Sequence, residues 1–206
     1  MNKMYIDPQH AALVLVDVQN DYCHENGLKA QQGADVSRFQ NTVSVIEKLV
    51  EQARKLDIPV VFIKNINSEE HLSEAWINRP GGMARSAVTR KGTWGAEIYR
   101  LVPQANDVVI EKSRFSAFIN TNLDEILREL NRTALIFTGF ATNVCVESSA
   151  RDGFMMDYHV TLVKDACAGY VPELEEATHK NIAAHFGAVV DSSEILQMWA
   201  QEEPVK

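Results

Sequence analysis

The chain has 206 residues, 46% of them hydrophobic and 23% charged, which is the composition of one globular domain with a sizeable core. Its net charge of −8 argues against nucleic acid or an anionic membrane as a partner. No run approaches the ~18 apolar residues of a membrane span, and the polar residues 1–10 lack a signal-peptide core, so we expect a cytoplasmic protein. Three cysteines without paired spacing predict free thiols.

Strands and helices are expected to alternate along the chain. A continuous apolar run over 11–16 is typical of a strand buried on both faces, and apolar residues recur at helical spacing over 35–56. A second strand is expected over 60–64, and residues 65–106, which have weak periodicity, predict a long and partly helical excursion. Further strands are expected over 108–110, 134–138, 160–163 and 189–190, and helices over 121–130, 142–151, 173–186 and 192–200. We expect the helix that begins at 142 to stop near Gly153.

This alternation predicts a single-domain, three-layer α/β/α fold over residues 1–206, with a six-stranded, mostly parallel sheet. Ligand sites in such folds lie beyond the carboxyl ends of the strands. The chemistry of the protein is therefore sought in the residues that follow each strand.

Three chemically complementary residues follow three of the expected strands. Asp17 follows the first strand, Lys112 the third, and Cys145 lies shortly after the fourth within the run GFATNVCV. Each also has an ordinary structural interpretation: Asp17 as a turn residue, Lys112 as a solvated lysine and Cys145 as a small core residue. Together they form a nucleophile, Cys145, whose pKa a helix N-terminus and Lys112 would lower, and a proton acceptor, Asp17. The backbone N–H groups of Ala141 and Cys145 are candidates for an oxyanion hole.

Four segments carry a resemblance to a known family: LVLVDVQNDYC, KSRFSAF, GFATNVCVESSARDGF and VTLVKDACA. They resemble the isochorismatase-like cysteine hydrolase superfamily over nearly the whole chain. The runs TNVCVES, RDGF and KGTWGAEI are similar to ureide hydrolases of the ureidoacrylate amidohydrolase type. The resemblance implies that Cys145 attacks an amide or carbamoyl carbonyl, that Asp17 shuttles the proton and that Lys112 stabilises the charged pair. It also implies a homodimer or homotetramer, and a cis peptide between Phe140 and Ala141.

Four residues are candidates for substrate binding. Asn65 matches an asparagine that helps to bind substrate in ureidoacrylate-type enzymes, although it also fits a turn. Trp94, Phe115 and Phe118 are expected to wall the pocket, and core packing is the alternative for each. Nicotinamidases of the superfamily bind a metal through an Asp-x-His pair after the second strand, where this chain reads KNIN. We therefore expect no catalytic metal and no cofactor.

Three functions remain open from the sequence. The first is a cysteine-dependent amidohydrolase that cleaves a C–N bond of a small amide or ureide through a thioester-type intermediate. The second is vinyl ether hydrolysis of the isochorismatase type, which does not require the thiol. The third is a catalytically silent binding protein on the same fold. Ureidoacrylate, other N-carbamoyl compounds, biuret-like ureides and simple amides are all possible substrates of the first.

Overall fold

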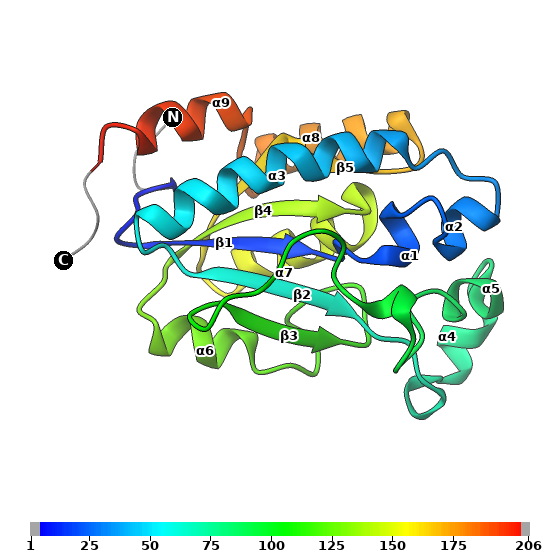
Figure 1. The fold of residues 1–206 in the computed structure, drawn as a ribbon. Coiled ribbons are helices and arrows are strands. Elements are labelled where there is room, and N and C mark those ends of the chain that lie inside the picture. Colours follow the sequence, from blue (N-terminus) through cyan, green and yellow to red (C-terminus); the bar gives the residue numbers. More distant parts are fainter. Residues whose placement is uncertain (1–4, 203–206) are drawn as a thin grey trace.

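A parallel sheet forms the centre of the molecule (Figure 1). The computed structural model describes residues 5–202, so the expected domain over 1–206 extends beyond the described part at both ends. Six strands pair in the order β3-β2-β1-β4-β5-β6, and all five pairings are parallel, which confirms the predicted fold class. The strands are β1 (Ala11–Val16), β2 (Val60–Asn65), β3 (Val108–Lys112), β4 (Ala134–Phe140), β5 (His159–Ala168) and β6 (Gly187–Val190).

Helices cover both faces of this sheet. Helices α3 (Ser37–Lys55) and α9 (Ser192–Trp199) pack on one face, and α6 (Leu123–Glu129), α7 (Glu147–Met155) and α8 (Pro172–His185) pack on the other. Successive side chains of a strand point to opposite faces, so Leu13 and Leu15 join the first core cluster while Val14 and Val16 join the second. This double burial explains why β1 is apolar throughout. No helix within residues 5–202 has the length and apolar character needed to cross a membrane.

The remaining helical segments gather beyond the carboxyl ends of the strands, where the arrowheads point in Figure 1. They are α1 (Asn20–Cys23), α2 (Leu28–Gln31), η2 (Glu69–His71), α4 (Glu74–Asn78), α5 (Gly82–Ser86) and η3 (Trp94–Ala96). The excursion over 65–106 is thus partly helical, as expected, but its helices span five residues or fewer. None of the residues of α4 is buried, so little core packing holds this segment.

The helix after the fourth strand ends near Gly153, as predicted, but the glycine itself does not end it. Helix α7 continues through Gly153 to Met155. A Cβ atom at Gly153 would lie 3.2 Å from the Leu135 side chain and 3.4 Å from that of Phe118. The glycine therefore lets the helix pack closely against β4. From the sequence alone, a glycine that is needed for such packing looks the same as one that ends a helix.

Gly139, near the end of β4, is required by a close approach of two strands. Its φ is +110°, and a Cβ atom there would lie 2.1 Å from the carbonyl oxygen of Val16 on β1. The register of β4 against β5 also shifts between Phe137 and Gly139. These features bring the segment after β4 close to the end of β1.

We predict that Gly139→Ala lowers the free energy of unfolding by about 2 kcal/mol or more, because it adds a steric clash to a strained φ. Gly33→Ala is the matched control, since Gly33 also has a positive φ, +88°, but nothing within 4 Å of the added Cβ. Its cost should be about 1 kcal/mol, from the backbone alone. Urea denaturation of both variants measures the difference, and equal losses would contradict the close approach.

Candidate active site

Asp17 is held in an unusual backbone conformation directly after β1. Its φ is +57°, a region that few non-glycine residues adopt and that is often found at functional sites. Its N–H donates to the carbonyl of Ile63 on β2 at 2.9 Å, and its carbonyl accepts from the N–H of Gln19 at 2.9 Å. The side chain of Gln19 donates to the carbonyls of Asn65 and Ala96, so it fastens this loop to the neighbouring segments.

Lys112, the last residue of β3, forms a buried ion pair with Asp17. Its Nζ lies 3.0 Å from Asp17 Oδ2, and the two side chains are 0% and 2% exposed. Lys112 pairs with Asn65 of β2, and β2 lies between β3 and β1. The side chain therefore reaches across two strand spacings, roughly 10 Å, and a long aliphatic stem is needed at this position. The other carboxylate oxygen, Oδ1, is buried and has no hydrogen-bond partner within residues 5–202.

Cys145 lies in the turn that joins β4 to α7. This turn, η4 (Thr142–Val146), is π-helical, a geometry that recurs at functional sites. Ser149 Oγ donates to the carbonyl of Cys145 at 2.7 Å and accepts from the N–H of Ala117 at 2.9 Å. On the other side, Glu175 of α8 accepts from the Thr142 hydroxyl at 3.4 Å and from the N–H of Gly169 at 2.6 Å. The cysteine turn is thus fixed from two directions.

The pKa values of the three groups are set mainly by burial. Burial raises the pKa of Asp17 above its ordinary 3.8, although the charge of Lys112 and hydrogen bonds with Cys145 and Lys112 lower it. Burial lowers the pKa of Lys112, but the charges of Asp17 and Cys145 raise it above 10.5 overall. These interactions place Asp17, Lys112 and Cys145 in one cluster, and their catalytic roles stay predictions.

The direction of the thiol pKa differs from the expectation. Burial raises the pKa of Cys145 above its ordinary 9.0, the charge of Asp17 raises it further, and the charge of Lys112 lowers it only in part. Burial therefore favours the protonated form of the Cys145 thiol. The sequence indicated the attractive effects of Lys112 and the helix N-terminus, but it could not show how deeply the thiol is buried.

The expected cis peptide between Phe140 and Ala141 is absent, because every peptide bond described in residues 5–202 is trans. The trans form is the lower in energy for a non-proline bond, by roughly 3–4 kcal/mol. Ala141 precedes the π-helical turn in an extended conformation, and its carbonyl accepts from the N–H of Val144 at 2.9 Å. The oxyanion hole formed by Ala141 and Cys145 remains a prediction.

A cavity of about 230 Å³ opens beside Cys145. The cysteine turn lines it through Ala141, Asn143, Val144 and Cys145. The excursion contributes Asn65, Asn67, Trp76, Arg79, Arg85 and Val88, and the segment after β3 contributes Phe115. Tyr22, Lys29, Tyr170, Val171 and Leu174 complete the wall. A larger hollow of about 610 Å³, lined by residues of 109–125, includes none of the catalytic candidates.

Two of the four predicted substrate-binding residues line this cavity. Asn65 does so while its amide nitrogen donates to the Thr89 hydroxyl at 2.8 Å and to the Tyr22 hydroxyl at 3.3 Å. Phe115 also lines it, and its ring packs on Trp76 with centroids 4.7 Å apart. Both residues are therefore placed to contact a bound molecule.

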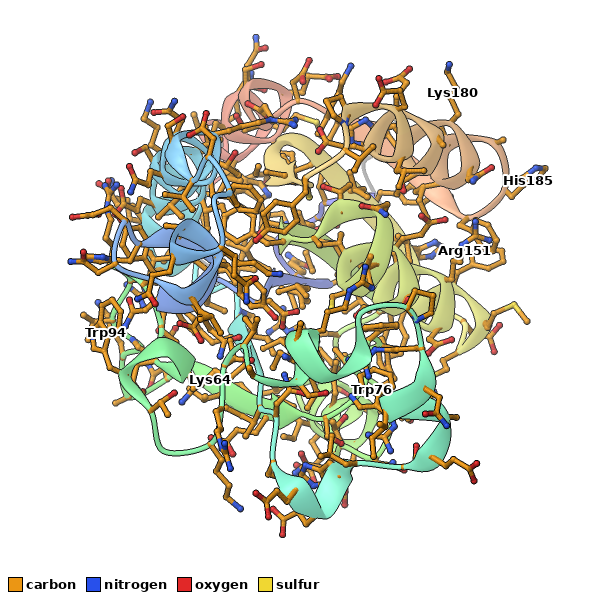
Figure 2. The ribbon with its side chains drawn as sticks, turned by 90° about the vertical axis from the view of Figure 1, so that its right-hand side faces the viewer. Lys64, Trp76, Trp94, Arg151, Lys180 and His185 are labelled. Carbon is orange, nitrogen blue, oxygen red and sulfur yellow. The ribbon has the colours of Figure 1, made fainter. Side chains whose placement is uncertain are left out.

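Trp94 and Phe118 are not brought to the cavity. Trp94 is 51% exposed and packs edge-on against His24, and Figure 2 shows it at the edge of the molecule, far from Trp76. Phe118 belongs to the core cluster beneath α6 and α7 and packs near Tyr158. The aromatic wall predicted from Trp94 is supplied instead by Trp76, which the weak periodicity of the excursion did not single out.

The other two thiols lie away from the cavity lining. Cys23 and Cys167 are 0% and 2% exposed, and burial raises the pKa of each. Within residues 5–202, no cluster of three or more histidine, cysteine, aspartate or glutamate side chains has the arrangement of a metal site. The expectation of a metal-independent reaction stays a prediction.

Comparison with known proteins agrees with this geometry. The family model described as the Isochorismatase domain matches residues 11–194. The chain is 32% identical to ureidoacrylate amidohydrolase RutB of Agrobacterium fabrum over 97% of this chain and 94% of that protein. It is 35% identical to the protein of the same name from Acinetobacter baylyi, over 95% of this chain and 86% of that protein.

A solved structure shows the same architecture. The crystal structure of a cysteine hydrolase from Pseudomonas syringae pv. phaseolicola is 25% identical, covers 95% of each chain and superposes with a TM-score of 0.84. The family match includes Asp17, Lys112 and Cys145. The chain therefore belongs to the isochorismatase family.

Proposed function

We propose that the protein is a cysteine-dependent amidohydrolase, which cleaves a C–N bond of a small amide or ureide through a thioester-type intermediate. The observation that carries this proposal is the buried cluster of Asp17, Lys112 and Cys145, in which Cys145 lines a cavity and the Asp17–Lys112 ion pair lies behind it. The two relatives named ureidoacrylate amidohydrolase support the reaction class.

The first half of the reaction forms the covalent intermediate. Asp17 takes the thiol proton as the sulfur of Cys145 adds to the substrate carbonyl, and its elevated pKa makes it a stronger base than an exposed aspartate. The N–H groups of Ala141 and Cys145 stabilise the oxyanion that forms. The C–N bond then breaks, and Asp17 returns the proton to the leaving nitrogen.

The second half releases the acid. A water molecule that loses its proton to Asp17 attacks the thioester or carbamoyl-enzyme carbonyl, and the sulfur leaves and regains a proton from Asp17. Lys112 stays charged throughout, because its elevated pKa holds the proton, and its charge stabilises the carboxylate and thiolate in turn. Asp17 alone therefore moves protons in this scheme.

The alternatives are less compatible with the site. Vinyl ether hydrolysis needs no thiol, and the site has one whose pKa is affected by the charges of both Asp17 and Lys112. A silent binding protein does not need a fully buried ion pair, whose loss of hydration is costly. The cytoplasmic location and the homodimeric or homotetrameric assembly stay predictions.

We predict that Cys145→Ala lowers kcat by about 10³-fold or more on the best substrate from an ammonia-release screen of amides and ureides. Cys145→Ser should be similarly impaired. Cys23→Ala is the matched control, because it removes a fully buried thiol outside the cavity and should keep its turnover per folded molecule. Wild-type turnover by Cys145→Ala would exclude the mechanism.

We predict that kcat/KM falls with decreasing pH through an acid limb whose midpoint lies above 3.8. The reason is that protonated Asp17 cannot accept the thiol proton, and burial raises its pKa. A pH–rate profile of the wild-type enzyme checks this. A midpoint at or below 3.8 would show that Asp17 is not the group that must be ionised.

We predict that Lys112→Met lowers the free energy of unfolding by about 3–5 kcal/mol at neutral pH, because it leaves a buried carboxylate unpaired. The acid limb of its residual activity should also move to higher pH, since Lys112 lowers the pKa of Asp17. Lys64→Met is the control: within residues 5–202 Lys64 pairs with the exposed Glu97 and Glu111, so its loss leaves no buried carboxylate and should cost about 1 kcal/mol or less. Equal losses in urea denaturation would contradict the burial of the Lys112 pair.

A further inference from the structure

The cavity beside Cys145 is lined by cations without any anion. Lys29, Arg79 and Arg85 all line it, and no aspartate or glutamate does. This is notable in a chain with a net charge of −8. Lys29 comes from α2, Arg79 ends α4 and Arg85 lies on α5, so two separate segments contribute positive charge to one space.

These three cations have no carboxylate partner. None of them forms an ion pair within the part of the chain that the structure describes, and the buried Nε of Arg79 has no hydrogen-bond partner there. The Arg79 guanidinium instead lies 3.8 Å above the Trp76 ring and donates to the Trp76 carbonyl. Lys29 donates to Gln32 and lies 5.6 Å from the centre of the Tyr170 ring.

Other cations of the same excursion are paired. Arg90 pairs with Glu69 at 2.9 Å, and Lys91 pairs with Glu70 at 2.9 Å. Both are exposed and neither lines the cavity. The contrast shows that the excursion has enough carboxylates to neutralise its outward-facing cations, while those that face the cavity are left without one.

The unpaired cations also repel one another. Burial lowers the pKa of Lys29 and of Arg79, and the charge of Arg85 lowers both further. The nearby carboxylate of Asp21 raises the pKa of Lys29 in part, but Asp21 already accepts the N–H groups of Leu28 and Thr89. A bound anion would relieve this repulsion, because it supplies the missing counter-charge.

We propose that Arg79 and Arg85, assisted by Lys29, bind a carboxylate on the substrate and so select anionic amides or ureides over neutral ones. The inference rests on the proposed function and narrows its substrate class. Guanidinium groups suit a carboxylate because their planar N–H donors match its two oxygens. Trp76 and Phe115 provide apolar walls in the same cavity for the carbon chain that joins the carboxylate to the reacting carbonyl.

The test compares three ureides of similar size. The acid is 3-ureidopropionate, the neutral isostere is 3-methylbutylurea, and the cation is (3-aminopropyl)urea. The wild-type enzyme should prefer them in this order of kcat/KM, with the acid at least about 10-fold above the neutral compound. Raising the salt concentration should reduce the preference, because it screens the attraction.

The variants Arg79→Gln and Arg85→Gln should each lower the acid-to-neutral ratio of kcat/KM by about 10- to 100-fold, mainly through KM for the acid. Arg90→Gln, which removes a paired cation of the same segment, should leave the ratio unchanged. Thermal unfolding checks that each variant is folded. Arg85 is exposed, so its variant keeps the test valid even if Arg79→Gln unfolds.

Measurements of ligand binding test the anion site separately from the cysteine mechanism. Calorimetry with folded Cys145→Ala protein should show tighter binding of 3-ureidopropionate than of 3-methylbutylurea, and Arg85→Gln in that background should remove the difference. Equal affinity for the two compounds, or a preference that neither arginine variant changes, would overturn the anion site and leave the cysteine mechanism intact. Wild-type turnover by Cys145→Ala would instead reject the mechanism, whatever the binding result.

Discussion

The buried ion pair between Lys112 and Asp17 is the interaction on which the rest of the site depends. Lys112 ends β3 and Asp17 directly follows β1, which are not neighbouring strands, so the pair forms only when β3, β2 and β1 have the observed order and register. Two charges in a dry interior cost several kcal/mol each in lost hydration, and their attraction does not always repay this. Such a pair therefore adds little to the stability of the fold. Its consequence here is that the carboxylate of Asp17 is held close to the Cys145 thiol and shielded from water.

The same pair explains the place of Cys145. The order of the strands reverses between β1 and β4, and ligands in open parallel sheets bind at this point. Asp17 follows one of these strands and Cys145 follows the other. The close approach at Gly139 and the anchoring of the turn by Ser149 bring the thiol to the carboxylate. In the proposed reaction, a thiol whose pKa is raised by burial stays unreactive until Asp17 takes its proton.

Sequence reasoning succeeded where geometry follows simple rules. Apolar runs bounded by polar residues identified the strands, and parallel sheets place the residues after those strands at one edge, so Asp17, Lys112 and Cys145 could be grouped before any contact was known. It failed where the outcome depends on tertiary packing. Phe115 and Phe118 are three residues apart, yet one lines the cavity and the other is in the core. The weak periodicity of 65–106 could not show that Trp76, and not Trp94, forms the wall, because long-range bonds such as Thr89 N–H to Asp21 position that segment.

The proposed reaction and the proposed substrate recognition use different parts of this molecule. Asp17, Lys112 and Cys145 lie at or just after the ends of strands that are buried in the core, whereas Trp76, Arg79 and Arg85 lie on α4, α5 and the residues between them, and no residue of α4 is buried. A substitution in that segment changes the shape or charge of the entrance without moving the ion pair beneath it. The fold can therefore acquire a new specificity through a few changes within residues 74–86. One reaction centre can in this way serve enzymes whose preferred molecules differ.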